Sequence, residues 1–152
     1  MPILKNTNGK GLQKLETFLK DMQGHKLYVG VTKSSNSRPK DGASNALIAY
    51  VHEFGIGVPE RSFLRSTVLE QGQKYLAIQR DNIIPAIKGG AMTADEAYRR
   101  LGIVASNDVK LKITNGPFTA LDQKTIDRKG SSKPLIDTGE LRQSITYEVR
   151  NA

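Results

Sequence analysis

Glycine and proline interrupt this chain at four places, and these breaks limit every helix to a short segment. The breaks are Gly24, the run Gly55-Ile56-Gly57-Val58-Pro59, the run Lys88-Gly89-Gly90, and Asn115-Gly116-Pro117. A chain of 152 residues has the size of one domain. The sequence therefore predicts a single domain, residues 1–152, that is built from several helices and strands of modest length.

Apolar residues at helical spacing predict helices within most of these segments. Leu12, Leu15, Phe18, Leu19 and Met22 form one stripe of an amphipathic helix that ends at Gly24. A second helix is expected from about residue 41–44 to residue 54, with Leu47, Ile48, Val51 and Phe54 on its buried side. Helical spacing returns over residues 62–87, where Pro85 predicts an interruption.

The second half of the chain begins with a clear helix start. Thr93 and Glu96 have the spacing of a capping box, and the helix that they open is expected to pass Gly102 and reach Ile113. A single helical turn is predicted near residues 125–128, and a short helix over residues 140–144. Residues 32–42 contain nothing that could anchor a core, and the chain is rich in loop over residues 116–133, so both segments are predicted to be flexible loops.

Two segments near opposite ends of the chain have the composition of strands. They are residues 26–31, Lys-Leu-Tyr-Val-Gly-Val, and residues 145–150, Ile-Thr-Tyr-Glu-Val-Arg. With so few strands among many helices, the predicted fold class is α+β: a small, mainly antiparallel sheet with several helices packed on one face.

The composition excludes several classes of protein. Without Cys the chain has no disulfide and no thiolate metal site, and no apolar run is long enough to cross a membrane. The formal net charge of +8 allows an alternative function as a basic nucleic-acid-binding protein. Because no run of like charges concentrates this excess, the sequence favours an ordinary basic surface.

Catalytic and metal motifs are incomplete in this sequence. His52-Glu53 resembles the start of a zinc-protease helix, but Ile56 stands where the second His is required. Asp137 and Glu140 are the only close carboxylate pair in an unusual context, and a small hydrolase would have to use them. We therefore expect no enzymatic activity, no metal and no cofactor.

The run Arg61-Ser62-Phe63-Leu64-Arg65 places two arginines around an apolar pair at a predicted helix start. One interpretation is structural: Phe63 and Leu64 fix the helix to the core while both arginines extend along the surface. The other is that one arginine binds a carboxylate of a partner, because a guanidinium suits bidentate interface contacts.

Several segments of the chain resemble tailed-bacteriophage neck and tail-completion proteins. They are the Val29-Gly30 strand, Tyr50-Val51-His52-Glu53-Phe54-Gly55, Pro59-Glu60-Arg61-Ser62-Phe63-Leu64, and the segment 134–145, Pro-Leu-Ile-Asp-Thr-Gly-Glu-Leu-Arg-Gln-Ser-Ile. With their flanks, these boxes cover about half of the chain. In many relatives Pro stands where this chain has Ser62.

The resemblance implies a non-enzymatic component of the phage virion, made in the host bacterial cytoplasm, that forms a ring at the head–tail joint. Six copies are the expected number. The implied partners are the connector or head-completion protein on one side and the tail tube or terminator protein on the other. DNA would pass through the lumen without sequence recognition, and no membrane is involved.

Six basic residues are the candidate contacts of such a ring. Four lie in the predicted flexible loops and two in the arginine box: Arg38, Lys40, Lys129, Lys133, Arg61 and Arg65. The order of the boxes also carries a prediction, because many relatives have the Thr-Gly-Leu-Ser box before the Val-Gly strand, whereas here it comes last. If this difference is a circular permutation, residues 26–31 and 145–150 lie side by side and antiparallel, with Tyr28 facing the segment 146–148.

Overall fold

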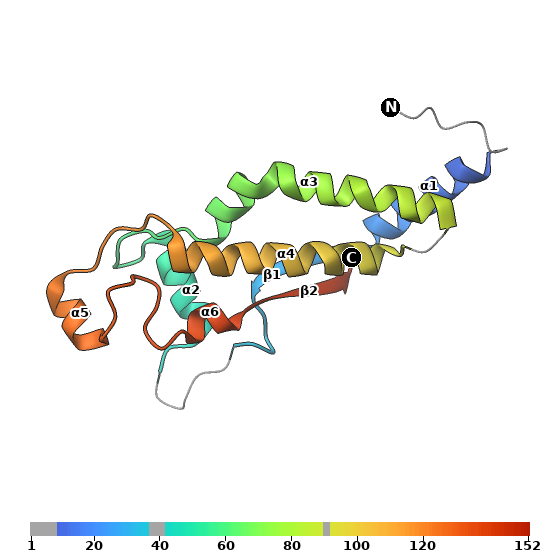
Figure 1. Cartoon of the computed structure of the whole chain (residues 1–152). Coiled ribbons are helices and arrows are strands. Elements are labelled where there is room, and N and C mark those ends of the chain that lie inside the picture. Colours follow the sequence, from blue (N-terminus) through green and yellow to red (C-terminus); the bar gives the residue numbers. More distant parts are fainter. Residues whose placement is uncertain (1–8, 37–41, 90–91) are drawn as a thin grey trace.

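The computed structural model describes residues 9–36, 42–89 and 92–152, which form six helices and two strands. In chain order these are α1 (Lys10–Gln23), β1 (His25–Val31), α2 (Asn45–Phe54), α3 (Leu64–Gly89), α4 (Ala94–Asn115), α5 (Gln123–Lys129), α6 (Glu140–Ser144) and β2 (Ile145–Asn151). Figure 1 shows α3 and α4 side by side along the length of the molecule, with α2, α5 and α6 near one end and α1 near the other.

The two strands form one antiparallel sheet that joins the two ends of the described chain. Tyr28 pairs with Glu148, and Val31 pairs with Ile145. This confirms the predicted α+β class and the predicted pairing of residues 26–31 with 145–150. The backbone N–H of Ala152 also donates to the Gly24 carbonyl oxygen at 2.8 Å, which extends the contact beyond the sheet.

Helix α4 packs against both strands, and one glycine makes this close approach feasible. A Cβ atom on Gly102 would lie 2.4 Å from the Tyr147 ring, so the helix must have glycine here to lie flat on β2. The helix starts as predicted, because the Thr93 hydroxyl accepts from the Glu96 N–H at 3.2 Å. It ends at Asn115, directly before Gly116-Pro117.

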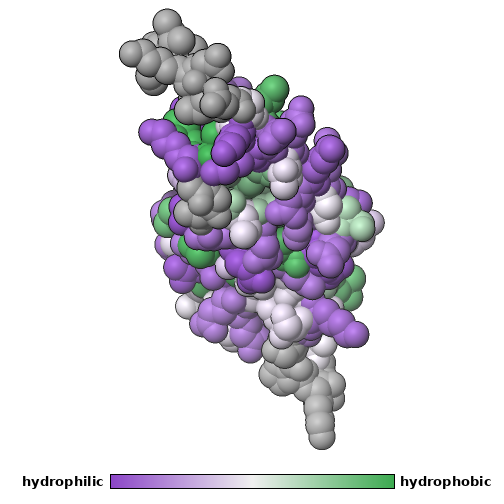
Figure 2. Space-filling model, turned by 90° about the vertical axis from the view of Figure 1, so that its right-hand side faces the viewer, coloured by the Kyte–Doolittle hydropathy of each residue, from purple (hydrophilic) through white to green (hydrophobic). Residues whose placement is uncertain are grey.

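Two groups of buried apolar side chains hold the elements together. At the α1 end, Phe18 packs with Ala86, Met92 and Ala97. At the other end the cluster joins residues from α2 to the start of β2: Ala49, Phe63, Val109, Ile113, Leu135, Leu141 and Ile145. Outside these clusters, hydrophilic side chains cover most of the face in Figure 2, where hydrophobic ones form separate small patches.

The buried face of α2 differs from the predicted one. Leu47 and Phe54 are about half exposed, whereas the fully buried residues are Asn45, Ala49 and Glu53. The reason is that the Glu53 carboxylate is hydrogen-bonded to the start of α3, which fixes the rotation of α2 about its axis. Periodicity of apolar residues gives no weight to such a polar anchor.

Two further predictions concern the breaks in the helices. Pro85 does not interrupt α3, which continues to Gly89. Because Pro85 has no backbone N–H, the carbonyl of Asp81 loses its helical hydrogen bond. Asp81 is exposed, so water can replace the missing bond. The segment 116–133 contains the seven-residue helix α5, which extends the predicted turn. None of the described helices is long and apolar enough to cross a membrane.

Candidate functional site

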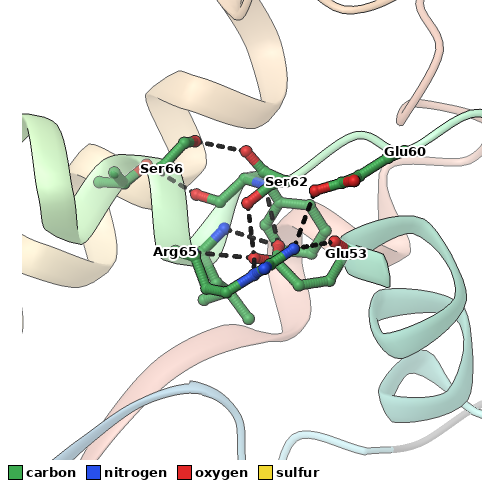
Figure 3. A network of polar contacts seen from close by, with 8 residues as sticks. Glu53, Glu60, Ser62, Arg65 and Ser66 are labelled. Atoms are coloured by element: carbon green, nitrogen blue, oxygen red, sulfur yellow. Dashed lines mark hydrogen bonds and ion pairs between the residues drawn. The ribbon is translucent and has the colours of Figure 1, made fainter. Parts of the chain in front are cut away.

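The junction between α2 and α3 is organised by the buried carboxylate of Glu53. The Ser62 hydroxyl, the backbone N–H groups of Phe63, Leu64 and Arg65, and the Arg65 Nε all donate to it, at 2.8–3.1 Å. Figure 3 shows how these donors converge on Glu53 from the start of α3 and from the two residues before it. We call these five residues the Glu53 cluster. The carboxylate satisfies N–H groups that a helix start leaves without partners, and it interacts favourably with the helix dipole.

Arg65 closes this cluster on the solvent side. Its Nη2 donates to the Glu53 carbonyl oxygen at 2.7 Å and to Glu60 Oε1 at 2.9 Å, and its guanidinium lies 4.7 Å from the centre of the Phe54 ring. The side chain is still about half exposed. Arg65 therefore has carboxylate partners within its own chain.

Hydrogen bonding keeps Glu53 ionised. Burial alone raises the pKa of this carboxyl, but the N–H groups of Leu64 and Arg65, the Ser62 hydroxyl and the Arg65 side chain together lower the pKa below its ordinary value. The negative charge is thus a built-in part of the α2–α3 junction.

The turn between the two helices depends on Gly55. Its φ of +66° lies in the left-handed region, and a Cβ atom here would approach Glu60 to 3.0 Å. The chain then returns along α2, where the Arg61 N–H donates to the His52 carbonyl oxygen at 2.8 Å. This return places the Arg61 side chain against a different part of the molecule from the one that Arg65 contacts.

Arg61 is buried, with only 4% of its surface exposed. Its Nε and Nη2 donate to the Thr119 carbonyl oxygen at 3.4 and 3.3 Å, and its Nη1 lies 3.3 Å from His52 Nδ1. Among the described residues, no Asp or Glu forms an ion pair with it within 4.0 Å. Burial of the guanidinium, which disfavours its charged form, lowers the pKa of Arg61.

A pocket of about 500 Å³ opens beside Arg61, between α2, α5 and the start of α6. His52, Arg128 and Lys129 line it together with Asp122, Asp137 and Glu140. We call it the Arg61 pocket. Burial lowers the pKa of His52, and the positive charges of Arg61 and Lys129 lower it further. His52 is therefore neutral near pH 7.

Lys129 is the second partly buried cation of this pocket. Burial lowers its pKa, the charge of Asp137 opposes that change, and Arg61 and Arg128 add to the lowering. Its Nζ donates to the Pro134 carbonyl oxygen at 3.3 Å. In the described part of the chain, no group of three or more His, Asp or Glu is arranged to hold a metal ion.

Comparisons with known proteins identify no relative of this chain. No family model, no curated protein and no solved structure matches the chain.

The structure separates the six basic residues that the sequence singled out. Arg61 and Lys129 line the same pocket, Arg65 belongs to the Glu53 cluster, and the Lys133 Nζ donates to the Thr114 carbonyl oxygen at 3.3 Å. Arg38 and Lys40 lie outside the described residues.

The structural interpretation of the arginine box is wrong for Arg61, which is buried, whereas its contact with a partner stays a prediction. The expectation that both arginines extend along the surface fails for it, because its guanidinium turns inward onto the Thr119 carbonyl. Phe63 and Leu64 contribute to the core as predicted: Phe63 is fully buried and Leu64 packs against the same cluster.

Sequence reasoning missed Glu53 and the pocket. The His52-Glu53 pair was interpreted only as a metal motif, although the helix dipole disfavours a Glu in the last turn of a helix, which is a signal that the carboxylate has a partner elsewhere. The pocket had no local signal, since it brings residues 52–61 against residues 122–140, a distant part of the sequence.

Proposed function

We propose that this protein is a structural, non-enzymatic subunit of a tailed-phage virion, located in the neck or tail-completion ring at the head–tail joint. The observation that carries the proposal is the antiparallel pairing of β1 with β2. The resemblance to neck and tail-completion proteins led to this pairing, in this orientation, from the reversed order of the boxes. The antiparallel orientation agrees with that expectation, and this agreement is what supports the proposal.

The arrangement of the resembling segments also supports the proposal. Three of the four contribute to a single core cluster, through Val29 of the strand, Phe63 of the arginine box, and Leu135 and Ile145 of the last box. Ala49, directly before the Glu-Phe-Gly segment, belongs to the same cluster. Segments that recur together in a family are expected to form one structural unit. The Glu53 cluster links two of them directly.

Large apolar side chains at the surface are consistent with contacts to neighbouring subunits. Leu69 and Leu76 of α3 are 83% and 65% exposed, and Tyr50 and Phe54 of α2 are about half exposed. A ring needs two different surfaces on each copy, because its contacts are heterologous and close by rotation. The proposed ring has six copies, contacts the connector or head-completion protein and the tail tube or terminator, and surrounds the DNA.

The alternative, a basic nucleic-acid-binding protein, receives less support from the charges. Seven of the basic side chains form ion pairs within the described chain, including Lys74 with Asp108 and Lys112 with Glu70. Cations that are already paired with carboxylates are poor candidates for phosphate contacts.

A deletion in a prophage that carries this coding sequence tests the proposal. After induction, electron microscopy should show filled heads and separate tails that fail to join, and the full chain supplied in trans should restore complete virions. Normal virions from the deletion strain would contradict the proposal.

A binding measurement tests the alternative in the same preparation. If the protein binds duplex DNA with an affinity that falls steeply as salt rises, and virion assembly is unaffected by the deletion, the nucleic-acid function replaces the structural one.

A further inference from the structure

Arg61 is an unusual charge to bury in a protein of this size. Only 4% of its surface is exposed, yet its side chain forms hydrogen bonds in the described chain only with the Thr119 carbonyl and the His52 ring. Buried charges are normally paired with an opposite charge, because the loss of hydration is otherwise uncompensated. Within the described residues, the fold therefore buries a cation that forms no ion pair with a carboxylate.

The contacts that Arg61 does have are weak and incomplete. All three are 3.3–3.4 Å long, beyond the usual 2.9–3.0 Å for N–H···O bonds. They use Nε and one N–H of each terminal nitrogen, out of five donors on the guanidinium. No hydrogen bond within the described residues uses the other two N–H groups, and a guanidinium can bind a carboxylate through two N–H groups at once.

The pocket gives a ligand access to this edge. Arg61 lines a space of about 500 Å³ that also reaches Lys129 and Arg128, so an anion that entered would meet a second and a third cation. His52, beside Arg61, adds no charge near pH 7.

We propose that the Arg61 pocket binds a carboxylate side chain from an acidic segment of a partner protein. The bound carboxylate takes the two remaining N–H groups of Arg61, and Lys129 lies near enough within the same pocket to contribute a second charge. This site would exist whether or not the chain is a neck subunit, because it rests on the pocket and on Arg61 alone.

The lining of the pocket favours a protein carboxylate over nucleic acid. Asp122, Asp137 and Glu140 also line the pocket, so three negative charges oppose the three cations. A nucleic-acid strand, with one phosphate at each nucleotide, would bring several charges to these carboxylates at once. A single carboxylate on a side chain can instead reach Arg61 and leave the rest of its chain outside.

The two histidines of the protein allow a direct test in the full-length wild-type chain. His52 lies beside Arg61, and His25 lies at the start of β1, beside Asp21 of α1. Burial is the main cause of the lowered pKa of His52, and the charge of Arg61 adds to it; a carboxylate on Arg61 would offset that second part, so the pKa should rise. NMR titration of the two rings, with and without a hexaglutamate peptide as the probe, measures this. We expect the His52 signals to move and those of His25 to stay in place.

Variants of equal charge separate the pocket from the general basic surface. Arg61→Gln should weaken hexaglutamate binding about ten- to hundredfold. The control Arg80→Gln removes the same charge from an exposed position on α3 and should change binding less than about twofold.

Three outcomes would overturn the proposal: no response of His52 at the highest peptide concentration, an equal response of His25, or equal losses in Arg61→Gln and Arg80→Gln. A fourth is that a single-stranded thymidine oligonucleotide moves the His52 signals while hexaglutamate does not, which would assign the site to phosphate. If Arg61→Gln fails to fold, the wild-type NMR comparison still decides, since both histidines report from one molecule.

Discussion

Arg61 and Arg65 stand four residues apart in one box, yet their surroundings are opposite. Arg65 is half exposed and has two carboxylate partners, Glu53 and Glu60, whereas Arg61 is buried and has none among the described residues. An exposed charge is hydrated and needs no partner, whereas a buried charge has lost its hydration and needs an opposite charge to compensate. The Glu53 cluster therefore has the properties of a completed internal structure, and the Arg61 pocket those of a site that a further molecule completes.

This difference gives each region a different expected response to mutation. Loss of a partner in the Glu53 cluster leaves a buried charge or buried N–H groups uncompensated, so folding stability should fall. Loss of Arg61 removes a charge that the fold does not compensate, so stability should change little while binding is lost.

The largest expected effect is that of Glu53→Gln. The variant keeps the shape of the side chain but loses the negative charge that accepts five hydrogen bonds. The NH2 group of Gln then lies against N–H donors, with which it cannot form a hydrogen bond. We expect a loss of about 3 kcal/mol in the free energy of unfolding, within the range for breaking a buried charged pair. Urea unfolding followed by circular dichroism measures it.

Glu60→Gln is the matched control for this variant. Glu60 also binds Arg65, but its side chain is 58% exposed, so the expected loss is about 0.5 kcal/mol or less. Equal losses for the two variants would mean that the Glu53 cluster contributes no more than a surface ion pair does.

The next effect compares Arg65→Met with Arg61→Met. Arg65→Met removes two contacts from Glu53, and because Arg65 is half exposed we expect a loss of about 1–2 kcal/mol. Arg61→Met replaces a buried cation by an apolar side chain of similar length, so the stability should stay within about 1 kcal/mol of wild type. A larger loss for Arg61→Met than for Arg65→Met would reverse the comparison.

This comparison of the two arginines depends on the structure and not on the sequence. Before the structure, nothing distinguished the two positions, since each is an Arg beside an apolar pair. The distinction comes from Gly55 and the turn that follows it, which place Arg65 over Glu53 and turn Arg61 toward Thr119.

The parts of the fold that depend on local pattern were predictable. Thr93 and Glu96 marked a helix start, Gly24 and Gly116-Pro117 marked helix ends, and the strand pairing followed from the resemblance. Rotation of α2 was not predictable, because a buried Glu and not an apolar stripe sets it. The Arg61 pocket depends on tertiary contacts among α2, α5 and the α6 start, which no single segment encodes.

The smallest expected effect is on the pH dependence of stability, and it separates the two regions by the pH at which each responds. Both His52 and Glu53 have a lowered pKa in the folded protein. The unfolded chain therefore takes up protons at higher pH than the folded one, so acid favours unfolding at both positions. The contribution of His52 is fully present above its ordinary value of 6.5 and is lost as the pH falls below it. That of Glu53 is present above 4.5 and is lost at lower pH, where Asp122 and Glu148 act in the same direction.

Urea unfolding at about pH 7.5, about 5.5 and about 4 should therefore show two successive decreases in the free energy of unfolding. His52→Gln should flatten the first decrease, since its side chain cannot take up the proton that Arg61 and Lys129 repel. Glu53→Gln should leave the first decrease and reduce the second. Hexaglutamate bound in the Arg61 pocket should weaken only the first, because its carboxylate would stabilise a protonated His52. If the first decrease persists unchanged in His52→Gln, the neutral histidine beside Arg61 is not its source, and the charge balance inferred for the pocket is wrong.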